Sequence, residues 1–342
     1  MHVTAHHKIL SLFKNILLLL VLVIVLAILS LVLVPCFENV SEEIVEGSST
    51  WMASVDGSKL LSDLYLPGTH DSATKYVDLA FFARCQALTI KQQLEVGFRY
   101  LDIRLGFDSQ GDKDTLAFYH GFCQCRSGAF PWSKPLDLDD VLSECYEFLS
   151  NNKTETIIFA VKQEKGLDNE QFQTMLLAKI AQSVEYWYLS ETMPTLDECR
   201  GKLVLVRRFD KIPANLKTPM GIPFLWTDQG DFEQTPLAFN IEPQADFRLI
   251  VQDRYKYDVK DKWHAFEKTL YMTNSDESNF STNVHLNFLS TNGSLAYGHP
   301  YYYASRLNKK FLESELSKIV PSWIIVDFGT AKLAQHIYQY NY

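Results

Sequence analysis

The chain has 342 residues, of which 47% are apolar and 21% charged, a composition typical of a folded globular protein rather than of a disordered chain. Its formal net charge of −9, from 32 basic and 41 acidic residues, argues against nucleic acid as the main partner. The length allows one large domain or two small ones.

The first predicted element is an apolar helix near the N-terminus. Residues 16–34 contain one polar side chain, Ser30. At 1.5 Å per residue a helix of this length covers about 28 Å, enough to cross a bilayer core of roughly 30 Å. The run is longer than a typical secretory leader and ends in Val34-Pro35-Cys36, without a small-residue cleavage site. The sequence therefore favours an uncleaved signal anchor over a removed signal peptide.

Charges around this helix indicate its orientation. Lys8 and Lys14 precede it, and acidic residues follow it at positions 38, 42, 43 and 46. The positive-inside rule predicts a short cytosolic N-terminus (1–15) before the transmembrane anchor (16–34), and a linker (35–50) followed by a large domain (51–342) that is extracellular or lumenal. Four N-x-S/T sequons, at Asn39, Asn152, Asn279 and Asn292, agree with a glycosylated protein of the secretory pathway.

Six cysteines would permit disulfides in such a compartment, but the sequence does not define their pairing. Cys123 and Cys125 are separated by one residue, which is not the spacing of a CxxC zinc or redox motif. No metal site and no cofactor are expected.

From Trp51 onward one pattern repeats: a short apolar or β-branched run, a polar cluster, and often an amphipathic stretch. The eight runs are 61–66, 100–105, 115–119, 156–161, 202–206, 247–251, 285–289 and 323–326. Helices are predicted at 138–149, 168–185 and 308–320, whereas five prolines and two glycines exclude a long helix within 211–246. The pattern predicts an α/β fold, an irregular (β/α)₈ TIM-type barrel preceded by one transmembrane helix.

Titratable side chains follow seven of the eight runs. They include His70, Asp71, Asp102, Arg104, His120, Lys162, Glu164, Arg207, Arg208, Asp253, Tyr255 and Asp327. Because the carboxyl ends of barrel strands meet at one mouth, these groups are expected to converge there. Two histidines with fixed cations suit metal-independent general acid–base cleavage of a phosphodiester. The G-x-S-x-G elbow, the Walker A loop and HExxH are absent.

Eight segments in chain order resemble the phosphatidylinositol-specific phospholipase C family, most closely its small single-domain bacterial type. They are LPGTHDSAT (66–74), FRYLDIR (98–104), FYHG (118–121), TETIIFAVKQE (154–164), RGKLVLVRRF (200–209), VQDRYK (251–256), HPYYYASRLN (299–308) and WIIVDF (323–328). The resemblance covers roughly residues 51–335. It implies cleavage of phosphatidylinositol, or of a glycosylphosphatidylinositol (GPI) anchor, to diacylglycerol and 1,2-cyclic inositol phosphate.

The resemblance also implies catalytic roles. His70 matches the general base that deprotonates the inositol 2-hydroxyl, and Asp327 matches the carboxylate that orients it. His120 matches the general acid that protonates the leaving diacylglycerol oxygen, assisted by Asp71. Arg104 stands where calcium-dependent members carry an acidic metal ligand, so it predicts independence from Ca²⁺.

Further positions match substrate contacts of the family: Asp102, Lys162, Glu164, Arg208, Asp253 and Tyr255. Tyr255 would stack on the inositol ring. Asp102 has an alternative role as a group that only orients Arg104 and His70, and Glu164 has one as a partner that only holds Lys162.

Members of the family dock on membranes through exposed tryptophans. Here Phe81, Phe82 and Tyr297 stand near those positions and are predicted membrane contacts, with core packing as the alternative for Phe81 and Phe82.

Two rival functions stay open. A non-catalytic module that binds an inositol or lipid head group would usually have lost a histidine or Arg104, and both histidines and Arg104 are present. A glycerophosphodiester phosphodiesterase on a related barrel would open with His-Arg-Gly, but His70 is followed by Asp71. The sequence does not choose between free phosphatidylinositol and a GPI anchor.

Overall fold

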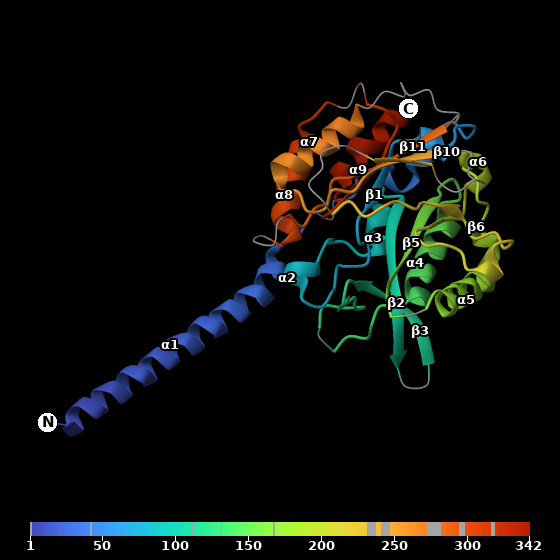
Figure 1. Ribbon diagram of the computed structural model, residues 1–342. Helices are drawn as coiled ribbons and strands as arrows, with labels where there is room; N and C mark the ends of the chain where they lie inside the picture. Colours follow the sequence, from blue (N-terminus) through green and yellow to red (C-terminus); the bar gives the residue numbers. More distant parts are fainter. Residues whose placement is uncertain are drawn as a thin grey trace.

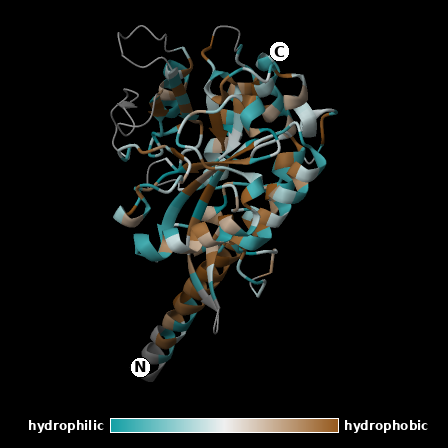
Figure 2. Cartoon of the chain, turned by 90° about the vertical axis from the view of Figure 1, so that its right-hand side faces the viewer, coloured by the Kyte–Doolittle hydropathy of each residue, from teal (hydrophilic) through white to brown (hydrophobic). Residues whose placement is uncertain are grey.

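The computed structural model describes residues 2–41, 43–110, 113–130, 132–166, 168–230, 237–240, 247–271, 282–293, 298–315 and 319–342. A long N-terminal helix, α1 (His2–Phe37), projects from a compact α/β body (Figure 1). Within α1, Leu10–Phe37 is long and apolar enough to cross a membrane, and its exposed apolar length is visible in Figure 2. A signal sequence near the N-terminus can also meet these criteria of length and hydropathy, so the helix is a candidate for either.

The body is built on a parallel sheet that curves into an irregular barrel. β1 (Leu66–Thr69), β2 (Tyr100–Gln110), β5 (Ile157–Lys165), β7 (Leu203–Arg207) and β8 (Ile222–Pro223) pair in parallel in that order. On the other side of β1, the parallel order is β12 (Trp323–Val326), β11 (Thr282–Phe288) and β10 (Phe247–Gln252). Among the described residues no ladder joins β8 to β10. The predicted fold class is confirmed.

Short strands flank this sheet. β6 (Trp187–Tyr188) pairs in parallel with β7, and β9 (Leu237–Asn240) pairs antiparallel with β10. β3 (Lys113–His120) folds back antiparallel along the extended end of β2, and β4 (Cys123–Gln124) pairs with β3.

Two of the predicted strands are wrong. The run 115–119 lies in β3, which is not a barrel strand. It forms a hairpin with β2, because β2 extends to Gln110 and β3 pairs antiparallel with this extension from Lys113 onward. The barrel strand that the pattern missed is β8, only two residues long, within the proline-rich stretch. Residues 61–66 are mostly not a strand: Leu61–Asp63 form a 3-10 turn, η2, with Leu61 and Leu64 buried in the core, and β1 starts at Leu66.

The remaining helices cover the sheet (Figure 1). They are α2 (Ala80–Ala83), α3 (Ile90–Glu95), α4 (Leu138–Asn151), α5 (Asn169–Ile180), α6 (Leu196–Cys199), α7 (Val259–Leu270), α8 (Pro300–Leu312) and α9 (Ala331–Tyr338). Asp137 and Asp168 cap α4 and α5 by accepting hydrogen bonds from the backbone N–H groups of Asp140 and Gln171.

The helix predicted at 138–149 is confirmed, and that predicted at 168–185 consists of α5 followed by the 3-10 helix η3 (Ala181–Tyr186). The boundaries predicted at 308–320 are wrong, because α8 begins at Pro300, a favourable first helical position, and ends at Leu312. Residues 316–318 of that prediction lie outside the described part of the chain. Among the described residues of 211–246, the only helical element is a 3-10 turn, η4 (Pro213–Asn215), so no long helix is found there.

Among the described residues of the predicted linker at 35–50, several side chains contact the folded body. α1 continues to Phe37, Glu38 and Ser48 are buried, and a 3-10 helix, η1 (Ser48–Ser54), packs under the barrel. Trp51 stacks on Tyr338 of α9, with ring centroids 5.1 Å apart. The segment between the apolar helix and the barrel therefore holds a defined place on the protein surface.

Candidate active site

A cavity of about 730 Å³ opens at the carboxyl ends of the barrel strands. Nine of the predicted site residues line it: His70, Arg104, His120, Lys162, Glu164, Arg208, Asp253, Tyr255 and Asp327. Asp71 and Asp102 lie beneath them, buried, and are tied to Arg104. Residues from β1, the β2–β3 hairpin, β5, β7, β10 and β12 thus converge as the barrel topology predicts.

The loop after β1 is shaped to present His70. Gly68 has no room for a side chain, since a Cβ there would lie 2.4 Å from Ile325 Cδ1 on β12 and 2.8 Å from Tyr100 Cβ on β2. Ser72 fastens the loop to β2 by accepting a hydrogen bond from the Asp102 N–H, at 2.8 Å. Asp71 adopts a left-handed backbone (φ 43°), which aspartate tolerates better than most residues.

His70 has the hydrogen-bond partners of a general base. Its Nε2 lies 2.8 Å from Arg104 Nη2, and its Nδ1 lies 2.8 Å from Asp327 Oδ1. Because a guanidinium only donates, Nε2 must accept, which places the single ring proton on Nδ1, donated to Asp327. Burial, helped by the charge of Arg104, holds the pKa of His70 well below its usual range. The imidazole is therefore neutral, with its lone pair at the cavity.

His120 has the opposite environment. Its Nδ1 donates to the Ala83 carbonyl at 2.8 Å, and its Nε2 lies 3.4 Å from Asp71 Oδ2. Both neighbours are acceptors, so the ring is suited to hold a proton on each nitrogen. The same Asp71 oxygen lies 3.3 Å from His70 Nε2, so one carboxylate oxygen stands between the two histidines.

Arg104 is held by carboxylates on two sides. Its Nε lies 3.0 Å from Asp71 Oδ1, and its Nη2 donates to Asp102 Oδ2 at 3.0 Å. Asp102 also accepts from Arg208 Nη1 at 2.9 Å, and although burial opposes its charge, the two arginines hold the pKa of Asp102 well below its usual range. Asp102 thus orients two cations from below the cavity floor.

Lys162 and Glu164 form a second charged pair at the rim, with Nζ and Oε2 2.6 Å apart. Glu164 also accepts from the Gly121 N–H at 2.9 Å, next to His120. Burial opposes the charge of Glu164, but Arg104 and Lys162 outweigh it and lower the pKa of the carboxyl.

The far wall of the cavity is aromatic. The Arg208 guanidinium lies 4.0 Å from the centre of the Trp226 ring, and Trp226 Nε1 donates to Asp253 Oδ2 at 3.3 Å. Tyr255 donates its hydroxyl to Asp228 Oδ1 at 2.8 Å, and burial together with Asp228 raises the pKa of Tyr255 to about 12. This wall offers both a flat apolar surface and hydrogen-bonding groups for a polyol ring.

The sequence reasoning missed several lining residues, among them Cys85, Asp210, Trp226, Asp228 and Asn292. Trp226 follows the two-residue strand β8, which has no periodic pattern to reveal it. Cys85 carries the only sulfur of the lining, 3.9 Å from His120 Nδ1, and burial raises the pKa of its thiol well above the usual range. The described groups that could hold a metal ion are subsets of this constellation: His70–Cys85–Asp327, Asp71–Cys85–His120 and His70–Asp71–Asp102.

The three predicted membrane contacts lie in different settings. Phe82 is half-exposed on α2, and Phe81 is partly buried and stacks on His299 at 4.2 Å. Tyr297 lies outside the described residues. Further exposed aromatic residues were not anticipated, among them Phe122, Phe130 and Trp132.

Several known proteins are similar to this chain. Residues 64–209 match the family described as phosphatidylinositol-specific phospholipase C, X domain. The 1-phosphatidylinositol phosphodiesterase of Staphylococcus aureus (strain Newman) is 27% identical over 307 residues, covering 85% of this chain and 91% of that protein. The enzyme of the same name from Listeria monocytogenes is 28% identical over 271 residues, covering 76% and 73%.

Solved structures are similar in fold. A phosphatidylinositol-specific phospholipase C from S. aureus superimposes with a TM-score of 0.68 at 24% identity, over 85% of this chain and 98% of that one. The L. monocytogenes enzyme gives a TM-score of 0.64 at 25% identity, over 86% and 98%.

Proposed function

Because the chain belongs to the phosphatidylinositol-specific phospholipase C family, we propose that it cleaves phosphatidylinositol between phosphorus and the diacylglycerol oxygen. It is a phosphoric diester hydrolase or lyase. The observation that carries the proposal is the pair of histidines with opposite hydrogen-bond environments on either side of Asp71.

In the proposed reaction His70 Nε2 takes the proton of the inositol 2-hydroxyl, and that oxygen attacks phosphorus. The bond from phosphorus to the diacylglycerol oxygen breaks, and His120 Nε2 gives its proton to the departing oxygen. The products are diacylglycerol and 1,2-cyclic inositol phosphate, with no net gain or loss of protons. Asp327 stabilises the imidazolium that forms on His70. Burial raises the pKa of the Asp327 carboxyl, which makes this carboxylate a stronger hydrogen-bond acceptor for the imidazolium.

Fixed cations complete the proposed site. Arg104 would neutralise the charge that builds on the phosphoryl oxygens, since it lies beside His70 and is already positioned by Asp71 and Asp102. Lys162, Arg208 and Asp253 would bind inositol hydroxyls, and Tyr255 would stack on the ring. A GPI anchor presents the same phosphoinositol group and is the alternative substrate.

The proposed topology follows the sequence. Residues 1–15 would lie in the cytosol, 16–34 would cross the membrane, and the barrel would lie outside the cell or in a lumen. Two positive charges before the helix and the acidic segment after it support this orientation.

The test is turnover of phosphatidylinositol in mixed micelles by the purified full-length chain, with EDTA present and the product identified by phosphorus NMR. We expect cyclic inositol phosphate to form even in EDTA, because Arg104 would neutralise the phosphoryl charge in place of a metal ion. His70→Ala and His120→Ala should each lower kcat by about 10²–10⁴-fold, the usual contribution of a general base or acid.

The matched control is His264→Ala, which removes an exposed histidine on α7 and should leave turnover unchanged. A rate that collapses in EDTA and returns with Ca²⁺ would refute the metal-free mechanism. A folded chain that binds inositol phosphate but turns over neither phosphatidylinositol nor a GPI-anchored protein would be a binding module instead.

A further inference from the structure

The end of α1 is fastened to the barrel by buried polar contacts. The Pro35 carbonyl accepts a hydrogen bond from Arg84 Nη1, and the Glu38 carboxylate accepts one from His299 Nε2. Glu38 exposes 4% of its surface and Arg84 exposes 7%. Groups as polar as these are buried only where they are paired.

His299 links this contact to the mouth of the cavity. Its Nδ1 donates to the Phe81 carbonyl at 2.5 Å, and its ring stacks on the Phe81 ring at 4.2 Å with an interplanar angle of 11°. Both ring nitrogens thus face acceptors, and although burial opposes the shift, the bonds to Glu38 and Phe81 raise the pKa of His299. We call Pro35, Glu38, Phe81, Arg84 and His299 the anchor clamp.

The anchor clamp adjoins residues that line the cavity, at two places in the chain. Arg84 precedes Cys85 and His299 precedes Pro300, and both Cys85 and Pro300 line the cavity. Figure 1 shows α1 leaving the body where α2 and α8 meet. The direction of α1 is therefore coupled to the direction in which the cavity opens.

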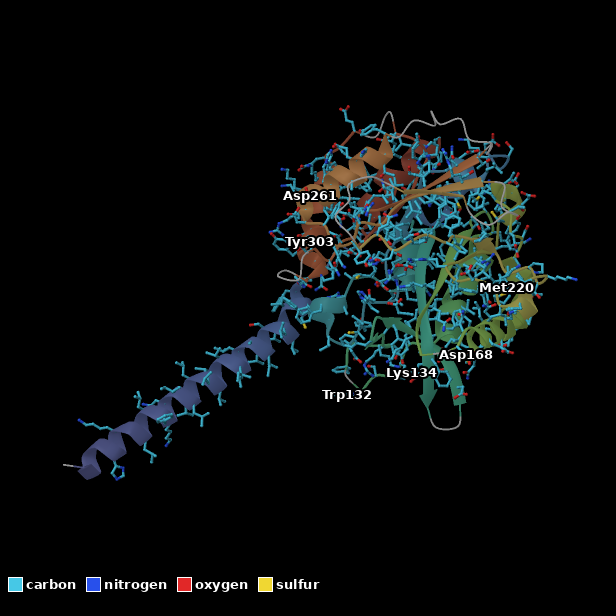
Figure 3. All side chains as sticks on the ribbon, viewed as in Figure 1. Trp132, Lys134, Asp168, Met220, Asp261 and Tyr303 are labelled. Carbon is cyan, nitrogen blue, oxygen red and sulfur yellow. The ribbon has the colours of Figure 1, made fainter. Side chains whose placement is uncertain are left out.

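Several aromatic side chains are exposed on α2 and in the segment that follows β3. Phe82, Phe122, Phe130 and Trp132 expose between 50% and 80% of their surface. Phe122 directly follows Gly121, a lining residue, and Phe130 stacks on Trp132 at 5.1 Å. Trp132 lies on the side of the body from which α1 departs (Figure 3). Aromatic rings with one wet edge favour the head-group region of a bilayer.

We propose that the anchor clamp retains α1 and holds the barrel so that the cavity and these aromatic side chains face the membrane that α1 crosses. The enzyme would then act on lipids of its own membrane. A leader that is removed has no need of a buried ion pair with the mature domain. A permanent anchor already keeps the enzyme at a high local concentration near its membrane, and buried contacts with the barrel also fix the orientation of the barrel. This inference rests on the proposed phospholipase activity and on the proposed span.

The experiment uses the full-length chain in phosphatidylinositol-containing vesicles. One variant, Glu38→Gln, removes the charge that pairs with His299; a second inserts a flexible Gly-Ser segment between Phe37 and Glu38, which keeps the tether but frees the barrel. Turnover of bilayer lipid should fall about tenfold in both, because orientation is lost, while turnover of a water-soluble inositol phosphodiester stays unchanged. Asp139→Asn, at the exposed Lys179–Asp139 pair, is the control.

A second readout does not depend on activity. An environment-sensitive dye on Ala129→Cys, an exposed position beside Phe130, would report whether these aromatic side chains contact the bilayer, in a Cys36→Ser background whose other cysteines are buried. The parent should give a blue-shifted emission that the insertion abolishes.

Equal bilayer turnover, or an unshifted dye in the parent, would overturn the proposal, as would an intact mass showing that the mature chain starts after Glu38. If the parent turns over neither substrate, the proposed function fails, and the dye and the mass still decide the clamp.

Discussion

At the scale of single residues, His70 and His120 have the same side chain and opposite surroundings. Arg104 donates to one ring, and a carbonyl and a carboxylate accept from the other. Since a neutral imidazole accepts at one nitrogen and an imidazolium donates at both, partners decide which ring is suited to be base and which acid.

This difference predicts the pH profile. In the proposed reaction His70 must be unprotonated to act as a base, so we expect activity to rise with pH as His70 loses its proton. Burial and Arg104 lower its pKa, and we expect the acid limb of kcat/KM on a water-soluble substrate to lie below pH 6.5. Arg104→Met removes one of these causes, so the limb should move to higher pH in addition to the loss of rate. Lys91→Met, on the surface, should not move it. A limb above 6.5 in the parent would contradict the assignment.

At the scale of elements, α7 brings a lysine into the protein interior. Lys262 is fully buried, and its Nζ donates to Gln252 Oε1 on β10 at 2.9 Å. Burial lowers the pKa of Lys262 to about 7, although Asp253 and Asp327 oppose the shift. The interface between α7 and β10 therefore contains a buried amine, and the cost of burying its charge lowers the stability of the folded protein.

Replacing this amine should stabilise the fold. The unfolded chain holds the lysine proton up to about pH 10, so between pH 7 and that value the folded protein binds fewer protons and gains stability as pH rises. Lys262→Met should raise the free energy of unfolding by a few kcal/mol at pH 7, on the order of the burial penalty, and by less at pH 10. Gln252 Oε1 keeps its bond from the Arg254 N–H.

The measurement is denaturant unfolding of parent and variant at both pH values, with the exposed Lys260→Met as control. A variant that is less stable at pH 7, or whose advantage grows with pH, would show that the lysine is stabilised by its surroundings.

At the scale of the whole molecule, both ends of the barrel chain are tied together at the end opposite the cavity. Arg99 pairs with Glu155 at 2.8 Å, both fully buried, and also donates to the Ser49 carbonyl of η1. Tyr342, the last residue, donates its hydroxyl to the Trp51 carbonyl at 2.9 Å. Stability contacts thus gather at one end of the barrel and reactive groups at the other, as is usual for this architecture.

Arg99→Met should therefore lower the free energy of unfolding by about 3–5 kcal/mol, because Glu155 would be left as an unpaired buried charge. Glu147→Gln, which breaks the exposed pair with Lys91, should change it by less than about 1 kcal/mol. Thermal unfolding of both variants beside the parent measures the contrast. Similar losses in the two variants would mean that the buried pair is not a structural centre.

The local sequence was sufficient for most of the strands and for most of the titratable side chains that line the cavity. Seven of the eight predicted runs overlap barrel strands, since alternation and apolar runs report burial directly, and β1 and β12 bring His70 and Asp327 together as the barrel order requires. The patterns failed for β8, because a strand of two residues is too short to show a period. They also failed for β3, because an apolar run does not reveal that this strand pairs antiparallel with β2 instead of joining the barrel.

Composition, periodicity and strand-end chemistry were enough to predict a barrel with an apolar N-terminal helix and a mouth rich in titratable groups, since each of these depends on neighbours within a few residues. The tautomer of His70, the shared oxygen of Asp71, the Trp226 wall and the anchor clamp depend on contacts between residues 18 to 261 positions apart. Only the packing of distant segments sets which donor meets which acceptor, and hydrogen-bond geometry and burial, which decide the chemistry, arise from that packing.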